Sequence, residues 1–195
     1  MKLEPAVLEN DFVRMEPIVD AHLPGLLDMA DDTDIWTYMP AGGAGEQFKP
    51  FFAYLQHEFD ARRWIPHTVF AKDASGDRIV GMSCYLNIAP HDHKVEIGGT
   101  WYHPSVHGTQ VNPSCKRLLL KHAFDCGANR VEFKTDARNA RSRAALRKLG
   151  AVEEGILRHH MLLPDGTYRD SAYFSILRGE WPSVDRALDQ RIQNS

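Results

Sequence analysis

The sequence predicts an α+β fold with a mixed, mostly antiparallel sheet. Two strand patterns, at 66–71 and 78–88, flank the turn-forming segment KDASGD, which is typical of a hairpin. A second pair of strand patterns lies within 152–177, on either side of the turn segment PDGT. Single helical patterns alternate with single strands elsewhere in the chain. Hairpins interrupted by single helices indicate a mixed sheet with flanking helices and argue against a doubly wound parallel sheet.

Composition is that of an ordinary globular protein. The chain has 195 residues, 43% of them hydrophobic and 25% charged, with a formal net charge of −3. We therefore expect a single domain over residues 1–195 with a substantial core. The dispersed Lys and Arg residues argue against a nucleic-acid partner, and the absence of a long apolar run argues against a membrane partner. Three cysteines predict free thiols in a reducing compartment, and without a signal-peptide pattern we expect a cytoplasmic protein.

The N-terminal segment predicts a strand followed by a short helix. Residues 7–17 have strand character, with a turn at Glu9–Asp11. Asp20 can cap a helix that runs through Met29. Pro24 fits the first turn of this helix, because its missing N–H would have no intrahelical partner there.

A loop and an aromatic helix follow. The loop 31–47 is rich in Asp, Gly and Pro and carries Trp36 and Tyr38, which could pack on a core or line a pocket. Residues 46–63 then predict an amphipathic helix. Its apolar positions are Phe48, Phe51, Phe52, Leu55 and Phe59. An aromatic stripe at this spacing predicts core packing and not a cofactor site.

The central stretch predicts a strand, a tight loop and a helix. Residues 95–102 are rich in strand formers, and the loop 106–112 carries turn and cap formers. The helix that follows has its apolar side at Val111, Cys115, Leu118, Leu119, His122 and Cys126. Unpaired N–H groups and the helix dipole favour a negatively charged ligand where the loop meets the helix. The residues themselves therefore predict an anion site at this loop.

The C-terminal part predicts two more helices around the second hairpin. A short strand at 130–135 leads into a helix over 137–149, which Gly150 ends as a left-handed C-cap. A terminal helix is expected at about 181–193. Its apolar side could pack on its own domain or form a homodimer contact.

Two motifs carry a resemblance to a known family. They are VEIGGTWYHPSVHGTQVN at 95–112 and TDARNARSRAALRKLGAVEEGILR at 135–158. These motifs resemble the GNAT superfamily of acyl-CoA-dependent N-acyltransferases, and within it the RimJ/RimL-like branch. The resemblance runs over nearly the whole chain, from VRMEPI to FSILRGEW. The resemblance implies a GNAT fold with splayed central strands flanked by helices, and acetyl-CoA as cosubstrate.

The resemblance also implies where the coenzyme lies. It places acetyl-CoA in a V-shaped gap between the strands 95–102 and 130–135, with the pyrophosphate on the loop. The coenzyme-binding positions that it implies are Trp101, Val106, His107, Gly108, Thr109, Gln110, Val111, Asn112, Asn139 and Arg143. Asn139 would bind the pantetheine arm or only cap its helix. Arg143 belongs to a basic helix that either faces solvent or reaches the 3′-phosphate of the coenzyme.

One position departs from the family pattern. The pyrophosphate loop of the family is usually Gln/Arg-x-x-Gly-x-Gly/Ala, and the matching positions here are His107, Gln110 and Asn112. Glycine lets the backbone approach the phosphates, whereas Gln110 adds a side chain. That side chain could point away, donate a hydrogen bond to a phosphate, or weaken coenzyme binding.

The resemblance suggests two catalytic residues. Glu96 lies where many family members carry a Glu and would act as the base that deprotonates the amine; the alternative is a solvent-facing strand residue. Ser142 would act as the acid for the leaving thiolate, or else only bond the preceding helical turn. The common tyrosine acid is absent, because Leu146 occupies its place. A backbone N–H within 98–101 would stabilise the developing oxyanion.

The ten histidines do not predict a metal site. His91 and His93 have poor spacing for a closed zinc site on a turn, and no Cys partner is near His159 and His160 in sequence. His67, His103 and His160 could instead be substrate-side groups, since imidazole titrates near neutral pH. The sequence does not rank these three histidines.

We therefore expect an N-acetyltransferase that transfers acetyl from acetyl-CoA to a primary amine in a ternary complex. A protein N-terminus or a small-molecule amine would be the acceptor, with Trp36 and Tyr38 on its side of the site. A cationic acceptor would call for acidic residues, which Asp28, Asp31, Asp32 and Asp34 could supply. The alternatives are a non-catalytic acyl-CoA-binding or regulatory module on the same fold, and a structural protein without a coenzyme.

Overall fold

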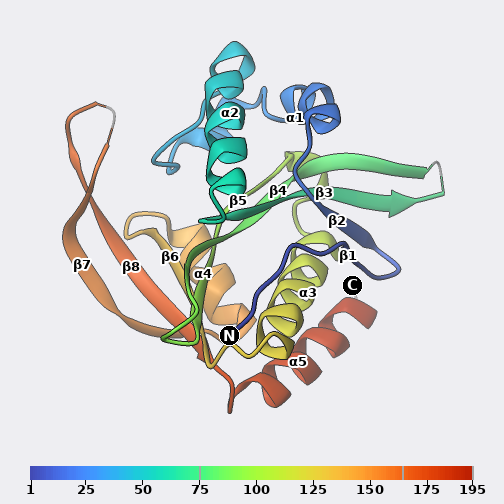
Figure 1. Ribbon diagram of the computed structural model, residues 1–195, viewed down its shortest axis with the longest axis vertical. Helices are drawn as coiled ribbons and strands as arrows, with labels where there is room; N and C mark the ends of the chain where they lie inside the picture. Colours follow the sequence, from blue (N-terminus) through green and yellow to red (C-terminus); the bar gives the residue numbers. More distant parts are fainter. Residues whose placement is uncertain (75, 164, 195) are drawn as a thin grey trace.

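One sheet of eight strands runs through the part of the chain that the structure, a computed structural model, describes: residues 1–74, 76–163 and 165–194 (Figure 1). Its spatial order is β1-β2-β3-β4-β5-β6-β8-β7. The strands are β1 Leu8–Glu9, β2 Val13–Pro17, β3 Ile65–Asp73, β4 Gly76–Ala89, β5 Lys94–Tyr102, β6 Arg130–Asp136, β7 Val152–Leu162 and β8 Tyr168–Leu177. Neighbours pair antiparallel except β5 and β6, which are parallel. The predicted α+β fold with a mixed, mostly antiparallel sheet is confirmed.

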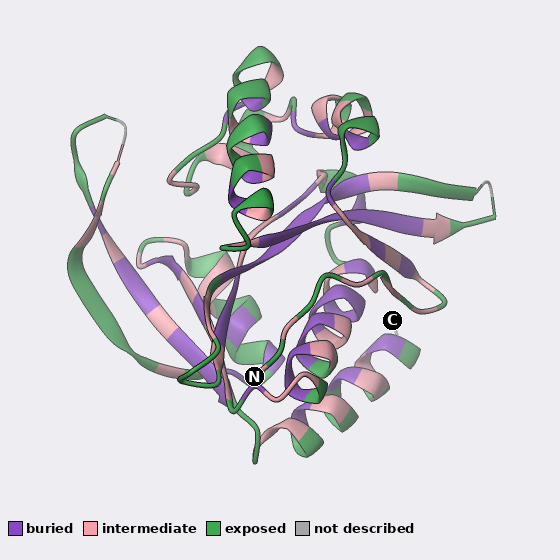
Figure 2. Cartoon of the chain, in the orientation of Figure 1, coloured by how far each residue is buried: buried purple, intermediate pink, exposed green. Residues whose placement is uncertain are grey.

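Helices cover both faces of this sheet. They are α1 Leu23–Met29, α2 Phe48–Asp60, α3 Val111–Asp125, α4 Ala140–Leu149 and α5 Trp181–Gln193. The helices α1 and α2 pack on one face, and α3, α4 and α5 on the other, so the buried side chains form a cluster on each side (Figures 1 and 2). Each amphipathic helix is stabilised by burying its apolar stripe on the sheet. None of the helices in the described ranges is long and apolar enough to cross a membrane.

The two central strands pair only briefly and then separate. The parallel register of β5 and β6 covers Lys94–Glu96 opposite Arg130–Glu132. Beyond these residues β5 stays with β4 and β6 stays with β8, so the facing edges carry backbone groups without a strand partner. The β4–β5 register shifts after Met82, opposite the stretch where Gly99 has a φ of +56°. The predicted splayed central strands are therefore confirmed.

The N-terminal elements differ most from prediction. The turn predicted at Glu9–Asp11 separates β1 from β2, because the Asn10 side chain accepts hydrogen bonds from the N–H groups of Phe12 and Val13 and closes the turn. The prediction that Asp20 caps a helix is wrong. Asp20 lies inside a 3₁₀ turn ahead of α1, and its carboxylate accepts a hydrogen bond from Gln56 of α2. The hydrogen bond from Gln56 uses the Asp20 carboxylate, which the local sequence pattern predicted to cap the helix.

The aromatic stripe of α2 packs in the core, as predicted. Phe48 and Phe52 are at most 2% exposed. Trp36, from the preceding loop, packs against Phe48 and Trp101 with ring-centre separations of 5.9 and 5.6 Å. Its indole N–H donates to the carbonyl oxygen of Ala30 at 2.9 Å. Trp36 therefore anchors the loop between α1 and α2 on the sheet.

The tips of the two predicted hairpins contain Ser75 and Pro164, which lie outside the described residues. The flanking strands pair as predicted, with Asp73 opposite Gly76 and Leu162 opposite Tyr168. The register of the strands on both sides of each tip confirms that both segments are hairpins.

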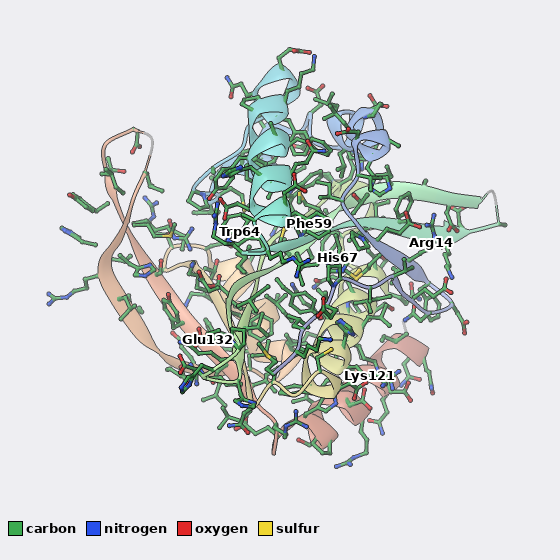
Figure 3. All side chains as sticks on the ribbon, in the orientation of Figure 1. Arg14, Phe59, Trp64, His67, Lys121 and Glu132 are labelled. Carbon is green, nitrogen blue, oxygen red and sulfur yellow. The ribbon has the colours of Figure 1, made fainter. Side chains whose placement is uncertain are left out.

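His67 is a core residue, so its expected place on the substrate side is wrong. It is fully buried on β3, and its two ring nitrogens lie 3.1 and 3.3 Å from the carbonyl oxygens of Ile65 and Ala6. Figure 3 shows it between the sheet and α3. Burial lowers the pKa of His67 to about 4. Its ring therefore links the N-terminal segment to the sheet interior.

We expect Gly81→Ala to destabilise the fold strongly. Gly81 on β4 has a φ of +150°, and a Cβ there would lie 2.9 Å from Tyr102 Cα and closer still to the Trp101 carbonyl oxygen. These are backbone atoms, so relief requires a shift of the β4–β5 register. The free energy of unfolding should fall by roughly 3 kcal/mol or more in denaturant titrations. Gly179→Ala is the control, because nothing lies within 4 Å of a Cβ there. Equal losses in the two variants would contradict the prediction.

Candidate active site

A cavity of about 540 Å³ opens where β5 and β6 separate. Its walls come from both strands, from the loop 106–108, from α3 and α4, and from the segment 34–41 between α1 and α2. It therefore connects the α3 side of the sheet with the α1–α2 side. Two substrates that approach from opposite faces could meet between the strands.

The loop ahead of α3 is held by its own side chains. His107 places Nε2 3.1 Å from the Tyr102 carbonyl oxygen, and the Thr109 hydroxyl donates to the Val106 carbonyl oxygen at 2.8 Å. Gly108 between them has a φ of +79°, which favours glycine. The N-cap position of α3 makes no side-chain capping bond, but the Val111 N–H donates to the Thr109 hydroxyl at 3.3 Å and the Ser114 N–H to the Gln110 carbonyl oxygen. Since Pro113 has no N–H, the Asn112 N–H and the helix dipole are what the first turn offers to an anion.

Gln110 does not need to be a glycine. Its φ of −68° and ψ of −13° are ordinary right-handed helical values, which any residue adopts. Within the described chain, Gln110 is not part of the cavity lining, whereas Asn112 and Pro113 are. Of the three possibilities raised by the sequence, the structure agrees with a side chain directed away from the cavity.

The structure brings together only some of the expected coenzyme-binding positions. Those that line the cavity are Trp101, Val106, His107, Gly108, Asn112 and Asn139. Among the described residues, those outside the lining are Thr109, Gln110, Val111 and Arg143. Val111 packs in the core at 6% exposure because it begins the apolar face of α3, and Thr109 closes the loop instead. Neither residue presents its side chain to the cavity.

Arg143 also lies elsewhere than expected. Its guanidinium donates to the Glu153 carboxylate at 2.6 Å and to the Ala137 carbonyl oxygen at 3.1 Å. These bonds tie α4 to β7 and leave the guanidinium directed away from the cavity. Arg141, two positions earlier, lines the cavity in its place.

Glu96 is buried in the cavity wall, so the solvent-facing alternative is wrong. Glu96 is only 1% exposed. Oε2 accepts hydrogen bonds from Asn87 Nδ2 at 2.8 Å and from Lys134 Nζ at 3.1 Å. A Cβ on Gly98 would lie 2.9 Å from Oε1, so glycine keeps space open beside this oxygen. Oε1 is therefore the oxygen placed to accept a proton.

Ser142, Asn139 and Leu146 line the cavity from the α4 side. The Asn139 side-chain oxygen accepts a hydrogen bond from the Ser142 N–H at 2.9 Å, so Asn139 caps α4. This bond uses the amide oxygen and leaves Nδ2 as a donor. Gly150 ends the helix with a φ of +96°, as predicted. Leu146 stands where the resemblance would place a tyrosine acid, so this part of the cavity wall is apolar.

Lys116 is a cavity residue that the sequence analysis missed. It lies on α3, is 8% exposed, and lines the cavity. Its ammonium donates to Thr100 Oγ1 at 2.8 Å and to Ser83 Oγ at 3.5 Å, and lies 5.9 Å from the centre of the Phe133 ring. It makes no ion pair with any carboxylate of the described residues. Burial lowers the pKa of Lys116 to about 8.

A sequence signal for Lys116 did exist. It follows Asn112 by four positions and precedes Leu119 by three, so it lies in a helical row that faces the sheet. Lysine is rarely buried, and its type alone therefore gave no reason to place it inside. The position in the helix, and not the residue type, carried the information.

The remaining candidates, apart from Asp34, lie outside the cavity lining. His103 accepts a hydrogen bond from the Ser105 N–H at 3.2 Å and so caps a 3₁₀ turn. His160 contacts the Ser171 hydroxyl at 3.1 Å. Of the four acids considered for a cationic acceptor, Asp28, Asp31, Asp32 and Asp34, only Asp34 belongs to the described cavity lining. The described residues contain no group of three or more His, Cys, Asp or Glu able to hold a metal.

A family model for the acetyltransferase (GNAT) domain matches residues 13–152. The chain belongs to the GNAT acetyltransferase family. Members are acyltransferases that use acetyl-CoA, in agreement with the gap between β5 and β6 and the N-terminus of α3. The resemblance inferred from the two motifs is thereby confirmed.

Individual relatives support the same family. The chain is 31% identical over 104 residues to a Bacillus subtilis (strain 168) protein named "Putative ribosomal N-acetyltransferase YdaF", and the match covers 53% of this chain and 56% of that protein. The chain thus spans just over half the length of this curated relative. A GCN5-related N-acetyltransferase from Brucella melitensis is 27% identical with a TM-score of 0.89, over 98% of this chain and 87% of its own. Mycobacterium smegmatis RimJ in complex with CoA-disulfide, at 21% identity, shares the fold with a TM-score of 0.79, over 96% and 95% of the two chains.

We expect Lys116→Met to change how stability depends on pH. The pKa of Lys116 is about 8 in the folded chain against an ordinary value of 10.5, so between these values the unfolded chain binds more protons. Lys116 should therefore contribute a rise of roughly 3 kcal/mol in the free energy of unfolding across this window, against the opposite contributions of Cys84 and Cys115, whose pKa values burial raises to about 12. Methionine cannot titrate, so the rise should be absent from the variant in urea titrations. Lys121→Met is the control, because Lys121 on the same helix is exposed and paired with Asp125 (Figure 3). The same pH slope in Lys116→Met and in the native chain would contradict the prediction.

Proposed function

We propose that this protein is an N-acetyltransferase that moves an acetyl group from acetyl-CoA to a primary amine by direct attack in a ternary complex. The observation that carries the proposal is the cavity between β5 and β6, which has a helix N-terminus at one wall and the buried Glu96 carboxylate at another. Family membership supports acetyl transfer in general. The position of Glu96 supports a reaction in which an amine must lose a proton.

Features of the cavity fit the coenzyme. The N-terminus of α3 suits the pyrophosphate, because the helix dipole and the Asn112 N–H favour negative charge there. The facing edges of β5 and β6 have backbone groups without a strand partner, which suit the amides of the pantetheine arm. Asn139 Nδ2 and the Arg141 guanidinium add donors from the α4 side. When bound, acetyl-CoA supplies the acetyl group as a reactive thioester.

Residues of this chain would then handle the protons and the charge. Glu96 Oε1 accepts the proton of the attacking amine, directly or through one water molecule. Backbone N–H groups in Gly98–Trp101, where β5 bulges, donate to the acetyl oxygen as it gains charge. The Ser142 hydroxyl donates the proton that the leaving sulfur needs. The Lys116 ammonium, held by Thr100 in the same gap, stabilises negative charge there.

We expect Gln110→Gly to leave coenzyme affinity no better than in the native chain. Gln110 already has helical backbone angles, so glycine relieves no strain and gives the loop no conformation that it lacks. Gly108→Ala is the matched change, because a φ of +79° disfavours a side chain even though open space surrounds it. That strain should weaken acetyl-CoA binding roughly tenfold. Calorimetric titration measures all three proteins, and binding that appears only in Gln110→Gly would contradict the loop assignment.

We expect Glu96→Gln to lower kcat by a factor of about 100 or more while the affinity for acetyl-CoA is kept, because the amide cannot accept the proton. A thiol-release assay with an amine acceptor, alongside calorimetry, measures both quantities. Glu132→Gln is the control, since Glu132 is the register partner of Glu96 on β6 and contributes nothing to the described cavity lining (Figure 3). An unchanged kcat in Glu96→Gln would remove the base from the proposal. Tight coenzyme binding by the native chain with no turnover on any amine would favour the non-catalytic module.

A further inference from the structure

Arg169 is a buried cation on the acceptor side of the cavity. It lies at the start of β8, is 4% exposed, and lines the cavity. Its Nη1 donates to the Tyr38 carbonyl oxygen at 3.3 Å, and its Nε is buried without a hydrogen-bond partner. Tyr38 belongs to the segment between α1 and α2, so Arg169 faces the side of the sheet opposite the α3 loop. The coenzyme phosphates would lie at that loop.

No carboxylate of the described residues forms an ion pair with Arg169. Asp136 is near enough to favour its charge but is already held by Arg138, whose Nη2 and Nε lie 2.8 and 3.0 Å from the two carboxylate oxygens. Glu96 also favours the charge from a distance, and its Oε2 is engaged by Lys134. Both neighbouring acids thus have other primary partners.

A buried arginine without an ion-pair partner destabilises the folded state. Removing an ion from water costs several kcal/mol unless a partner and hydrogen bonds compensate, and the buried Nε leaves one donor unsatisfied. Burial accordingly lowers the pKa of Arg169 from its ordinary range. A planar guanidinium with free donors matches a carboxylate, which it can bind with two parallel hydrogen bonds. A ligand that brings a carboxylate into the cavity would compensate the charge of this arginine.

The charge of the cavity agrees with an anionic ligand. The ionisable residues in its described lining, other than His107 and the buried Cys84 and tyrosines, are Asp34, Glu96, Lys116, Lys134, Arg141, Arg169 and Arg191. Cations outnumber carboxylates, and one of the two carboxylates is paired with Lys134. Lys116 and Arg141 would face the negative charge of the coenzyme, so the like charge that a polyamine or an amine-rich antibiotic would meet is that of Arg169.

We propose that the acceptor is a small amine that carries a carboxylate, such as an amino acid, and that Arg169 binds this carboxylate while the amine faces Glu96. The inference rests on the proposed acetyl transfer. In that step the amine nitrogen bonds to the acetyl carbon, the carbon–sulfur bond breaks, and Glu96 takes the amine proton. The coenzyme leaves as its thiol with a proton from Ser142, and transfer of the Glu96 proton through water to Ser142 restores both groups. Arg169 touches the substrate only through the carboxylate and serves for recognition.

The experiment compares acceptors that differ only in the carboxylate. The native protein and acetyl-CoA are given α-amino acids and their α-amides as pairs, with spermidine and a neutral C-terminally amidated peptide as further acceptors, and thiol release is followed. We expect kcat/KM for the acid to exceed that for the amide by roughly 30-fold or more. The amine of an amino amide is less basic, so more of it is neutral, and amine reactivity alone would not produce this preference.

Variants at Arg169 separate recognition from structure. In Arg169→Met the acid-to-amide ratio should fall towards one while calorimetric binding of acetyl-CoA is unchanged, and Arg169→Lys should recover part of the ratio. Arg158→Met is the control, because Arg158 is exposed on the neighbouring strand β7 and absent from the described lining. If Arg169→Met does not fold, Arg169→Lys and the acceptor pairs on the native protein still test whether Arg169 recognises the carboxylate.

Three outcomes would overturn the inference. The carboxylate site is wrong if kcat/KM for the amides, for spermidine or for the peptide equals kcat/KM for the acids. It is also wrong if the Arg169 variants lose activity on acids and amides equally. Both of these outcomes leave the proposed acetyl transfer intact. If acetyl-CoA binds and no acceptor is acetylated, the proposed transferase function fails, and the carboxylate site fails with it.

Discussion

The separation of β5 from β6 is the constraint on which the rest of the site depends. Two parallel strands that stayed paired would use their backbone groups on each other and leave no passage through the sheet. Here the shared register ends at Glu96, and the bulge around Gly99 holds β5 against β4 beyond that point. The resulting gap brings together groups from both faces: the α3 loop and α4 on one side, and the segment after α1 on the other.

Buried charge lines this gap, and its cost points to function. Among the described residues, Glu96 is compensated by Lys134 and Asn87, whereas Lys116 is held by two hydroxyls and the Phe133 ring, and Arg169 has a carbonyl partner and an unsatisfied donor. A fold selected only for stability would avoid such groups, since unpaired buried charge opposes folding. Charge that is poorly compensated by the protein and faces a cavity is the expected property of a site that binds charged ligands.

Sequence patterns located most elements because periodicity reports which face is buried. The aromatic row of α2, the Gly150 cap and both hairpins follow from rules that act over a few residues. Errors arose where a distant partner competed with a local one. Asp20 bonds Gln56 instead of capping α1, and His67 points into the core instead of the substrate side. In each case the side chain could serve either role, and only the neighbouring element decided between them.

The sequence by itself determined the α+β fold, the family, and the candidate anion site at the start of α3, because these depend on residue spacing and on backbone N–H groups. The tertiary structure alone decided which side chains share the cavity. Lys116 and Arg169 are far apart in the chain and belong to residue types that are rarely buried, and they line one space only because α3 and β8 pack against the diverging strands. Local rules fix how a segment folds, whereas burial and charge pairing depend on what packs against it.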